Sequence, residues 1–365
     1  MNNRLNKISI PLAFITAGAM LSACSEADEQ TAATPGDNAI RFAAGAEYAS
    51  RAASDITTNN LSEFAVYAYT GSATDPQLFM NNVTVKKTAS NTWTYSPLKY
   101  WPSEPVDFYA FAPEGWASTD GPLKPVEYYN FPGHTDLIYA VSLDNKGEPA
   151  ANNAQVILNF RHALSKVTLN LSSSNTRLKV YVTNAVMKGL MMKGQFHFPQ
   201  ASTNTTTGTP AQNSIGTWDN LNTPYIYAFH ISRSLDERLL LTTTPTDMSD
   251  GDWGGPKYLI PQTLTYRSEG FGNDSFIAIM CSIYDAETGT KLWPNDNTPP
   301  ENIATGSSFG DGILKFPLST TQFSAWQPGY HYIYNLIINA NPEMGAINFG
   351  SPTVDTFIDV ESNYN

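Results

Sequence analysis

The segment Asn60-Leu61-Ser62-Glu63-Phe64-Ala65-Val66-Tyr67-Ala68 carries a clear strand pattern in a chain of 365 residues. Leu61, Phe64, Val66 and Tyr67 begin a predicted strand, and a similar apolar run, Phe108–Ala112, ends at Pro113 and Gly115. Further apolar runs are separated by Gly, Pro, Asn and Asp, and they cover residues 155–160, 166–171, 225–230, 238–242, 276–284 and 330–339. Many strands divided by turn residues predict a mainly β fold built of sandwiches.

The composition narrows the class of protein. The chain is 41% hydrophobic and 12% aromatic, which excludes disorder of the whole chain and suffices for two domains. Lys and Arg number 21 against 33 Asp and Glu, which gives a net charge of −12. We expect no nucleic-acid partner, because a protein that binds nucleic acid must neutralise phosphates.

No residue pattern predicts a catalytic, metal or cofactor site. The five histidines show no ligand spacing, and the sequence contains no nucleophile elbow, phosphate loop or dinucleotide fingerprint. The sequence leaves open a pair of glycosidase carboxylates, because such a pair is defined by its distance in space and not by its spacing along the chain. We interpret His162 as a structural hydrogen-bonding residue, Cys281 as a core residue and Asp250-Gly251-Asp252 as a turn. We therefore expect no enzyme activity, no metal and no cofactor.

Three tryptophans suggest an alternative function. Trp93, Trp101 and Trp116 cluster in a Pro-rich region and could stack on sugars, although packing in the core also explains them. The alternative is a monomeric, glycan-binding surface lipoprotein.

The N-terminus resembles that of an exported lipoprotein. Arg4 and Lys7 precede an apolar run, Ile8–Leu21, which is short for a membrane-spanning helix. Leu21-Ser22-Ala23-Cys24 resembles the lipobox of bacterial lipoproteins, in which Cys24 carries the lipid that anchors the chain to the outer membrane. The polar, partly acidic residues 25–38 predict a flexible tether.

The strand runs divide into two sets. Residues 166–171 close the first set before Ser172-Ser173-Ser174-Asn175, which predicts a domain junction near residues 172–180. Residues 200–216, rich in Thr, Asn and Ser, predict a long surface loop.

A series of motifs follows the tether. They are Ala39-Ile40-Arg41-Phe42-Ala43, Ser50-Arg51-Ala52, the segment 60–68, Phe79-Met80-Asn81-Asn82, Trp93-Thr94-Tyr95, Tyr100-Trp101-Pro102, Asp107–Pro113, Phe160–Val167 and Pro328–Tyr334. This order behind a lipobox resembles the fimbrillin family of Bacteroidota, the subunits of type V pili. The resemblance covers nearly the whole chain after Cys24.

The resemblance implies two transthyretin-like β-sandwich domains in tandem and cleavage of a lipoprotein precursor by an arginine-specific protease. The matching bond is Arg51-Ala52. In the family, cleavage removes a first strand and opens a groove, which a terminal strand of a neighbouring subunit fills. Arg41 is a rival site, but cleavage there would split the candidate displaced strand around Ile40 and Phe42.

Strand removal also has a physical consequence that does not depend on the family. A sandwich that loses a strand exposes unpaired backbone groups and an apolar slot, which together form an assembly site. Ala346-Ile347-Asn348-Phe349 repeats the apolar residues of Ala39-Ile40-Arg41-Phe42 at the same spacing, and the segment from Val354 to Val360 alternates behind it. Two ordinary strands of one sandwich remain the other explanation of this repeat.

The predicted donor strand can contribute substantial binding energy. Its apolar residues would each contribute about 1.5–3 kcal/mol if buried in a neighbour, or on the order of 10 kcal/mol together before the cost of ordering the tail. These residues are Ile347, Phe349, Val354, Ile358 and Val360.

The sequence thus predicts a structural pilus subunit, exported as an outer-membrane lipoprotein and incorporated into a cell-surface fimbrium that supports adhesion. The predicted parts are a signal peptide (1–23), a removed tether and first strand (24–51), two sandwiches (52–172 and 173–340) and a donor extension (341–365). Expected partners are other pilin subunits of the same or an accessory kind, the arginine-specific protease, membrane lipid through Cys24, and host or bacterial surface ligands.

Overall fold

β-strands make up almost all regular structure in the computed structural model of this chain. It describes residues 39–45, 55–57, 60–116, 121–147, 155–203, 212–232, 234–248, 256–265, 274–320, 323–340, 347–348 and 353–356. Within these ranges there is no α-helix, and the 3-10 turns include η1 (Gln212–Ser214), η2 (Leu235–Glu237) and η4 (Pro300–Asn302). The expected mainly β class is confirmed. No helix of the described ranges is long and apolar enough to cross a membrane.

Six antiparallel strands build the first sheet, in the order β4-β3-β2-β5-β7-β9. Phe64 and Val66 of β2 belong to one hydrophobic cluster, whereas Ala65 and Tyr67 belong to another. Apolar residues follow one another in this strand because alternate side chains enter two different cores. The bounds are β2 (Glu63–Ser72), β3 (Asp75–Lys87), β4 (Trp93–Thr94), β5 (Val106–Ala112), β7 (Ile138–Asn145) and β9 (Arg161–His162).

A two-stranded sheet packs on one face of the first sheet. β1 (Arg41–Gly45) runs parallel to β8 (Gln155–Asn159). Phe42 of β1 and Leu158 of β8 share one hydrophobic cluster with the inner residues of β2 and β5. These two layers form the first sandwich, and β1 supplies one of the two strands in its smaller layer.

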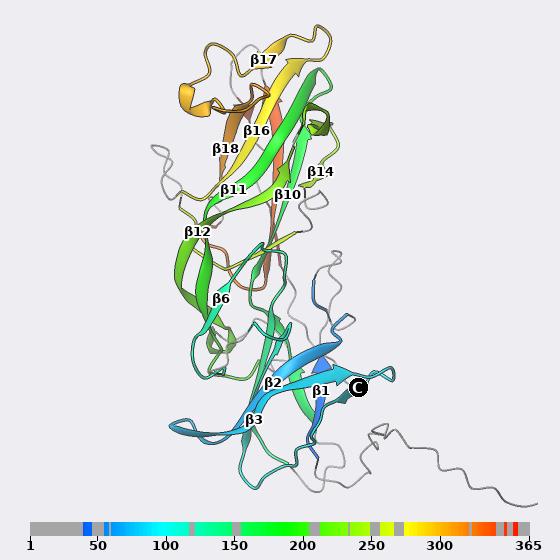
Figure 1. Cartoon of the computed structure of the whole chain (residues 1–365), viewed down its shortest axis with the longest axis vertical. Helices are drawn as coiled ribbons and strands as arrows, with labels where there is room; N and C mark the ends of the chain where they lie inside the picture. Colours follow the sequence, from blue (N-terminus) through cyan, green and yellow to red (C-terminus); the bar gives the residue numbers. More distant parts are fainter. Residues whose placement is uncertain are drawn as a thin grey trace, which may run out of the picture. The chain divides into compact units, whose positions relative to one another are not determined.

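Two larger sheets form the second sandwich. One has the order β12-β11-β16-β17 with β13, β18 and β6 attached, and Figure 1 shows β11 and β16 side by side. Its bounds are β6 (Val126–Tyr129), β11 (Leu178–His197), β12 (Thr217–Ile231), β13 (Leu239–Leu241), β16 (Phe276–Asp285), β17 (Lys291–Trp293) and β18 (Gly312–Pro317).

The opposite sheet has the order β14-β10-β19-β20, with β15 paired to β10 and β21 paired to β19. β10 and β19 are parallel. The bounds are β10 (Ser165–Ser173), β14 (Thr246–Asp247), β15 (Lys257–Leu259), β19 (Tyr330–Ala340), β20 (Ile347–Asn348) and β21 (Thr353–Thr356).

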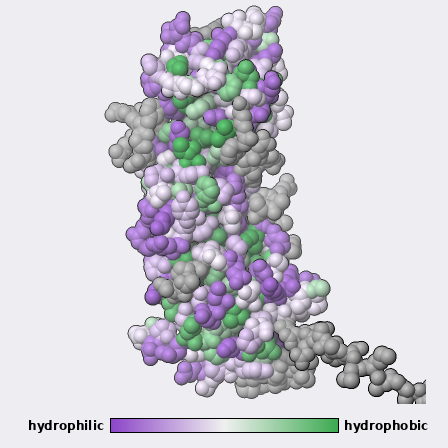
Figure 2. All heavy atoms as spheres, viewed as in Figure 1, coloured by the Kyte–Doolittle hydropathy of each residue, from purple (hydrophilic) through white to green (hydrophobic). Residues whose placement is uncertain are grey.

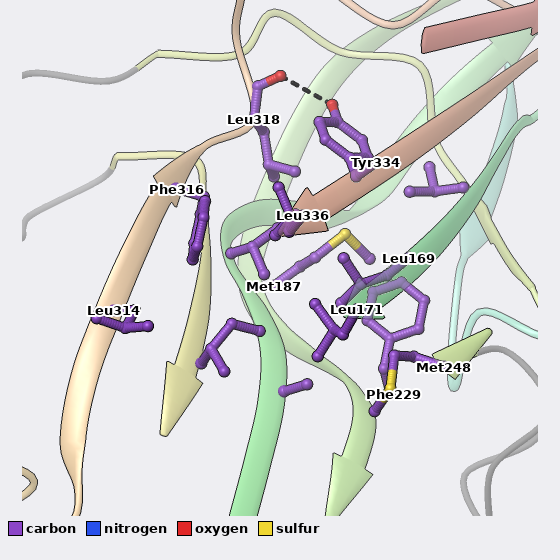
Figure 3. Packing of buried hydrophobic residues seen from close by; sticks show 14 of the residues in the cluster. Leu169, Leu171, Met187, Phe229, Met248, Leu314, Phe316, Leu318, Tyr334 and Leu336 are labelled. Atoms are coloured by element: carbon purple, nitrogen blue, oxygen red, sulfur yellow. Dashed lines mark hydrogen bonds between the residues drawn. The ribbon is translucent and has the colours of Figure 1, made fainter. Parts of the chain in front are cut away.

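The core of the second sandwich lies between these two sheets. Leu169 of β10 and Leu336 of β19 meet Met187 of β11 in one buried cluster (Figure 3). The hydroxyl of Tyr334 donates a hydrogen bond of 2.8 Å to the carbonyl of Leu318. Burial raises the pKa of Tyr334 above its usual value, so this hydroxyl stays protonated and remains a donor.

A third cluster connects the outer face of the first sheet to β11. Tyr109 and Phe111 of β5 pack edge-on against Phe198, which directly follows β11. The far end of this long strand therefore covers the face of the first sheet that β1 does not cover.

The surface of the protein mixes hydrophobic and hydrophilic residues, as Figure 2 shows for one face.

The structure corrects two expectations about strand order. Residues 166–171 are predicted to close the first set of strands, but they lie in β10, which pairs with β19 of the second sandwich. The expected junction near residues 172–180 overlaps the start of β11, a strand of 20 residues. β10 is thus a strand of the second sandwich, and the chain also contributes β6 to that sandwich before it returns to the first sheet with β7 and β9. Residues 38–365 form one compact unit, and their division into two domains remains a prediction.

Candidate functional site

The first strand of the described chain lies in the interior of a sandwich. Ile40 is fully buried and Phe42 is 2% exposed. Residues 40, 42 and 44 share one face because side chains alternate along an extended strand, and Arg41 on the other face is only half-buried. The predicted displaced residues Ile40 and Phe42 are thus core residues of the first sandwich.

Aromatic side chains from three segments surround the ring of Phe42. The ring centroids lie 5.6 Å from Phe108 of β5, 5.4 Å from Tyr95 and 6.2 Å from Phe64 of β2, all in edge-on geometry. Burial of Phe42 contributes about 1.5–3 kcal/mol, and each ring pair adds roughly 0.5–1.5 kcal/mol. This side chain is therefore a main hydrophobic anchor of β1.

The segment after β4 holds the backbone at the start of β1. The N–H of Ile40 donates to the carbonyl of Lys99 at 2.9 Å, and the hydroxyl of Tyr95 donates to the carbonyl of Ile40 at 3.0 Å. Burial raises the pKa of Tyr95, so its hydroxyl stays protonated and keeps donating. Ala39 also forms an antiparallel bridge with Tyr100. Both polar groups of Ile40 are therefore satisfied inside the fold.

Among the described residues, β1 is the only strand that pairs with β8. Five residue pairs join the two strands, from Arg41 opposite Gln155 to Gly45 opposite Asn159. Removal of β1 would take the strand partner from this edge of β8 and uncover the apolar residues that contact Phe42. Such an edge beside an apolar slot can accept another extended segment.

The chain is anchored again shortly after the predicted cleavage site. The carboxylate of Asp55 pairs with the ammonium of Lys166 at 2.7 Å and accepts a hydrogen bond from the hydroxyl of Tyr258. All three side chains are buried. Because β1 is held on one side and Asp55 on the other, the predicted bond after Arg51 lies between two fixed points of the fold.

Two isolated residues have the structural roles that the sequence predicts. Nδ1 of His162 lies 3.0 Å from the buried carboxylate of Asp136, which also accepts the N–H of Ile56 at 2.9 Å. Cys281 is fully buried in the second core, and burial raises the pKa of its thiol. The interpretation of His162 as a hydrogen-bonding residue and of Cys281 as a core residue is confirmed.

Two segments of the predicted donor extension pair with β19. β20 lies antiparallel to Asn339 and Ala340, and β21 lies antiparallel to residues 330–333. Ile347 therefore belongs to a strand with two paired residues and Val354 to one with four. The remaining predicted donor residues, Phe349, Ile358 and Val360, lie outside the described residues.

The predicted processing residues are not all described. Cys24, Arg51 and Ala52 lie outside the described residues, as does the turn predicted at residues 250–252. The rival cleavage residue Arg41 lies within β1, opposite Gln155. Cleavage at Arg41 would therefore divide a strand that is paired along its whole length.

The three tryptophans do not form an exposed platform for sugars. Trp101 is 9% exposed and packs 5.9 Å from Phe108, and Trp116 is 7% exposed and stacks 6.0 Å from Phe198. Trp93 is half-buried and packs 4.9 Å from Phe64. Core packing explains these rings, so the glycan-binding alternative loses the residues on which it rests.

Sequence patterns did not identify the residues that receive β1. Tyr95, Phe64 and Phe108 come from separate segments, and no spacing along the chain links them to Phe42. The partner strand β8 begins more than 100 residues after β1 and is equally hidden in the sequence. Within the described part of the chain, no cluster of three or more His, Cys, Asp or Glu side chains could hold a metal ion.

Comparison with known proteins agrees with this architecture. Residues 50–355 match the family model described as fimbrillin-like. No curated protein matches the chain. A solved fimbrial protein from Bacteroides vulgatus shares the fold at 16% identity and a TM-score of 0.54, over 88% of this chain and 99% of that one.

Two other solved structures are less similar. A protein described as a cell adhesion protein from Bacteroides uniformis is 13% identical, with a TM-score of 0.47, over 89% of this chain and 100% of that one. The fimbrial anchor protein Mfa2 from Porphyromonas gingivalis is 8% identical, with a TM-score of 0.27, over 89% and 99% of the two chains. Since the family model matches 306 of 365 residues, from 50 to 355, the chain belongs to the fimbrillin-like family.

Proposed function

We propose that this chain is a structural subunit of a cell-surface pilus that supports adhesion and assembles by strand exchange. The precursor is exported as a lipoprotein lipidated at Cys24 and is cleaved by an arginine-specific protease between Arg51 and Ala52. Loss of residues 24–51 frees it from the membrane lipid and removes β1. The donor extension of another pilin subunit, with Ile347 and Phe349 leading, then fills the empty place.

The observation that carries this proposal is the burial of β1 in a chain of this family. Ile40 and Phe42 lie in the core, yet they sit N-terminal to a candidate protease site and are joined to the rest of the chain only through residues 46–54. Cleavage leaves this strand held by noncovalent contacts alone. A strand that fills a core but loses its covalent connection can be replaced by a competing segment of similar shape.

The anchor at Asp55 supports the same division of the chain. Its ion pair with Lys166 and its hydrogen bond from Tyr258 hold the residues that follow the cut. Breaking a buried ion pair by removing one partner typically costs about 3–5 kcal/mol, so this anchor resists release. The released peptide, residues 24–51 with β1, can therefore leave, while the new N-terminus at Ala52 stays close to the fold.

The part of the donor extension that repeats the β1 motif, β20, has the shorter pairing within its own subunit. In the described part of the chain, β20 pairs with two residues of β19, whereas β1 pairs with five residues of β8. Exchange would replace this short pairing by burial of Ile347 and Phe349 at the positions of Ile40 and Phe42. The gain in buried apolar surface drives assembly.

The test compares the wild-type precursor with an Arg51→Ala variant, both treated with an arginine-specific protease. We expect the wild type to release the peptide that carries β1 and to form polymers, measured by size-exclusion chromatography and mass spectrometry. The Arg51→Ala chain should keep β1 and remain monomeric. Polymers formed by the uncleaved variant would contradict the proposal.

A donor variant separates the two halves of the exchange. The double change Ile347→Asp and Phe349→Asp leaves the cleavage site and the β1 slot intact. After cleavage this chain should not polymerise alone, but it should accept the tail of a wild-type subunit and end the polymer there. If it polymerises as well as the wild type, the C-terminal extension is not the donor.

A further inference from the structure

A groove lies on the outer face of the seven-stranded sheet. Val186, Phe276 and Ala278 form a small hydrophobic cluster, while their sequence neighbours Met187 and Ile277 belong to the core of the second sandwich. Side chains alternate across a strand, so these two groups lie on opposite faces of the sheet. The groove above the small cluster has a volume of about 890 Å³. It is separate from the site of β1, which lies in the first sandwich.

One rim of the groove exposes large apolar side chains. Phe131 is 57% exposed and Ile226 is 50% exposed, and both line the groove. The ring of Phe131 lies 5.5 Å from that of Tyr225, edge-on. Neighbouring exposed apolar residues beside a hollow are typical of an interaction surface.

The groove is more basic than the rest of the chain. Lys188, Lys257 and Lys315 line it together with two acids, Asp274 and Glu301. Lys257 and Asp274 are buried, and Nζ of Lys315 also donates to the carbonyl of Glu301 at 2.9 Å. The whole chain carries 21 basic against 33 acidic residues. An apolar floor with an excess of lysines favours an extended segment that combines apolar and acidic side chains.

The C-terminal extension contains such a segment, which the β1 slot alone does not accommodate. β8 offers five paired residues, whereas the two donor segments span residues 347–360. Fourteen extended residues reach roughly 46 Å, about three times the length of a five-residue strand. The last part, Phe357-Ile358-Asp359-Val360-Glu361, alternates apolar residues with two acids.

We propose that residues 357–361 of a second copy of this chain bind in the lysine groove. Ile358 and Val360 contact the apolar floor formed around Phe276, and Asp359 and Glu361 lie near Lys188 and Lys315. This inference rests on the proposed function in that it assigns a place to the second part of the donor extension. It adds a contact between subunits that does not require removal of β1.

The test measures binding of a fluorescent peptide of residues 353–365 to the full-length, uncleaved Arg51→Ala chain. This acceptor also carries Asp359→Asn and Glu361→Gln, so that its own tail lacks the two acids. We expect the peptide to bind, and we expect Lys188→Glu with Lys315→Glu to weaken binding at least tenfold. The matched control is Lys179→Glu, an exposed lysine of the same strand β11 outside the groove, which should change binding less than twofold.

Variants of the peptide test the same contact without altering the fold of the acceptor. A peptide with Asp359→Asn and Glu361→Gln, or one with Ile358→Ser and Val360→Ser, should bind at least tenfold more weakly. If these variant peptides bind as tightly as the natural peptide, the inference is overturned. It is also overturned if Lys188→Glu with Lys315→Glu leaves the affinity of the natural peptide unchanged.

Cleavage separates this inference from the proposed function. The 353–365 peptide should bind cleaved and uncleaved acceptors equally, whereas a peptide of residues 344–350 should bind only after β1 has left. If the 353–365 peptide binds only the cleaved chain, both segments use the β1 slot, so the groove assignment is wrong while strand exchange stands.

Discussion

Two ends of the chain carry nearly the same tetrapeptide in different surroundings. Ala39-Ile40-Arg41-Phe42 lies in the first core, with β1 paired to five residues of β8. In the second copy, Ala346-Ile347-Asn348-Phe349, the described residues Ile347 and Asn348 form β20 and pair with two residues of β19. Among the described residues, the same apolar pattern therefore forms a core strand with five paired residues at one end and a strand with two paired residues at the other.

The difference shows that local sequence sets the face of a strand, and its partners set how firmly it is held. β1 lies in a slot lined by Phe64, Tyr95 and Phe108. Within the described ranges, β20 pairs with β19 alone. Under the proposed strand exchange, an equivalent slot in a neighbouring subunit would give the C-terminal copy the aromatic contacts that Phe42 makes here.

The largest expected effect distinguishes the two copies by stability. Phe42→Ala in the uncleaved precursor should lower the free energy of unfolding by about 3–5 kcal/mol, because it removes a buried ring and leaves a cavity. Ile347→Ala should cost less than about 1 kcal/mol, since a strand with two paired residues adds little to the fold. Urea titrations of both variants, followed by tryptophan fluorescence, measure the two changes. Equal losses would show that both copies are structural strands of the monomer.

Much of the first sandwich can be predicted from local pattern. The runs 60–68 and 108–112 overlap β2 and β5 of the first sheet, because short apolar runs between turn residues predict buried strands. Ile40 and Phe42 were found in the same way, as apolar residues on one face of a short segment. The burial of Cys281 also follows from its position inside an apolar run.

The pairing of strands could not be predicted in this way. β10 lies beside β19, whose first paired residue, His331, is far from Lys166 in the sequence, and no residue of β10 indicates that partner. The apolar pattern does not predict β11, because Lys188 and Gly189 interrupt its apolar residues at a place where its register with β12 also shifts. Gly189 has a φ of +71°, a conformation that favours glycine and breaks the strand pattern.

A smaller effect is expected from the hydrogen bond that holds β1 at its start. Tyr95→Phe removes the donor to the buried carbonyl of Ile40 while keeping the ring that packs against Phe42. Leaving this carbonyl without its donor should destabilise the precursor by about 1–2 kcal/mol. After cleavage, the same change should speed release of the β1 peptide roughly tenfold, if it lowers the barrier by about 1.4 kcal/mol.

Release of the β1 peptide can be followed by mass spectrometry at fixed times after protease addition. Tyr100→Phe is the control, because its side chain is 55% exposed. That control should leave the release rate unchanged. Equal release from Tyr95→Phe and the wild type would mean that this hydrogen bond does not retain β1.

The smallest effect makes the two tetrapeptides identical. Arg41→Asn converts the first copy into Ala-Ile-Asn-Phe, and residue 41 is only half-buried, so the free energy of unfolding should change by less than about 1 kcal/mol. A peptide of residues 38–45 with Asn at position 41 should likewise bind the cleaved, emptied subunit within about threefold of the natural peptide, a difference of about 0.65 kcal/mol. A loss beyond tenfold would mean that the polar position contributes to recognition, and the tail would then be a poorer copy than its apolar residues suggest.

The Arg41→Asn variant also identifies the cleaved bond, because it leaves Arg51 intact. Normal processing of Arg41→Asn, with a product that begins at Ala52, assigns the cut to Arg51, whereas failure of processing assigns it to Arg41.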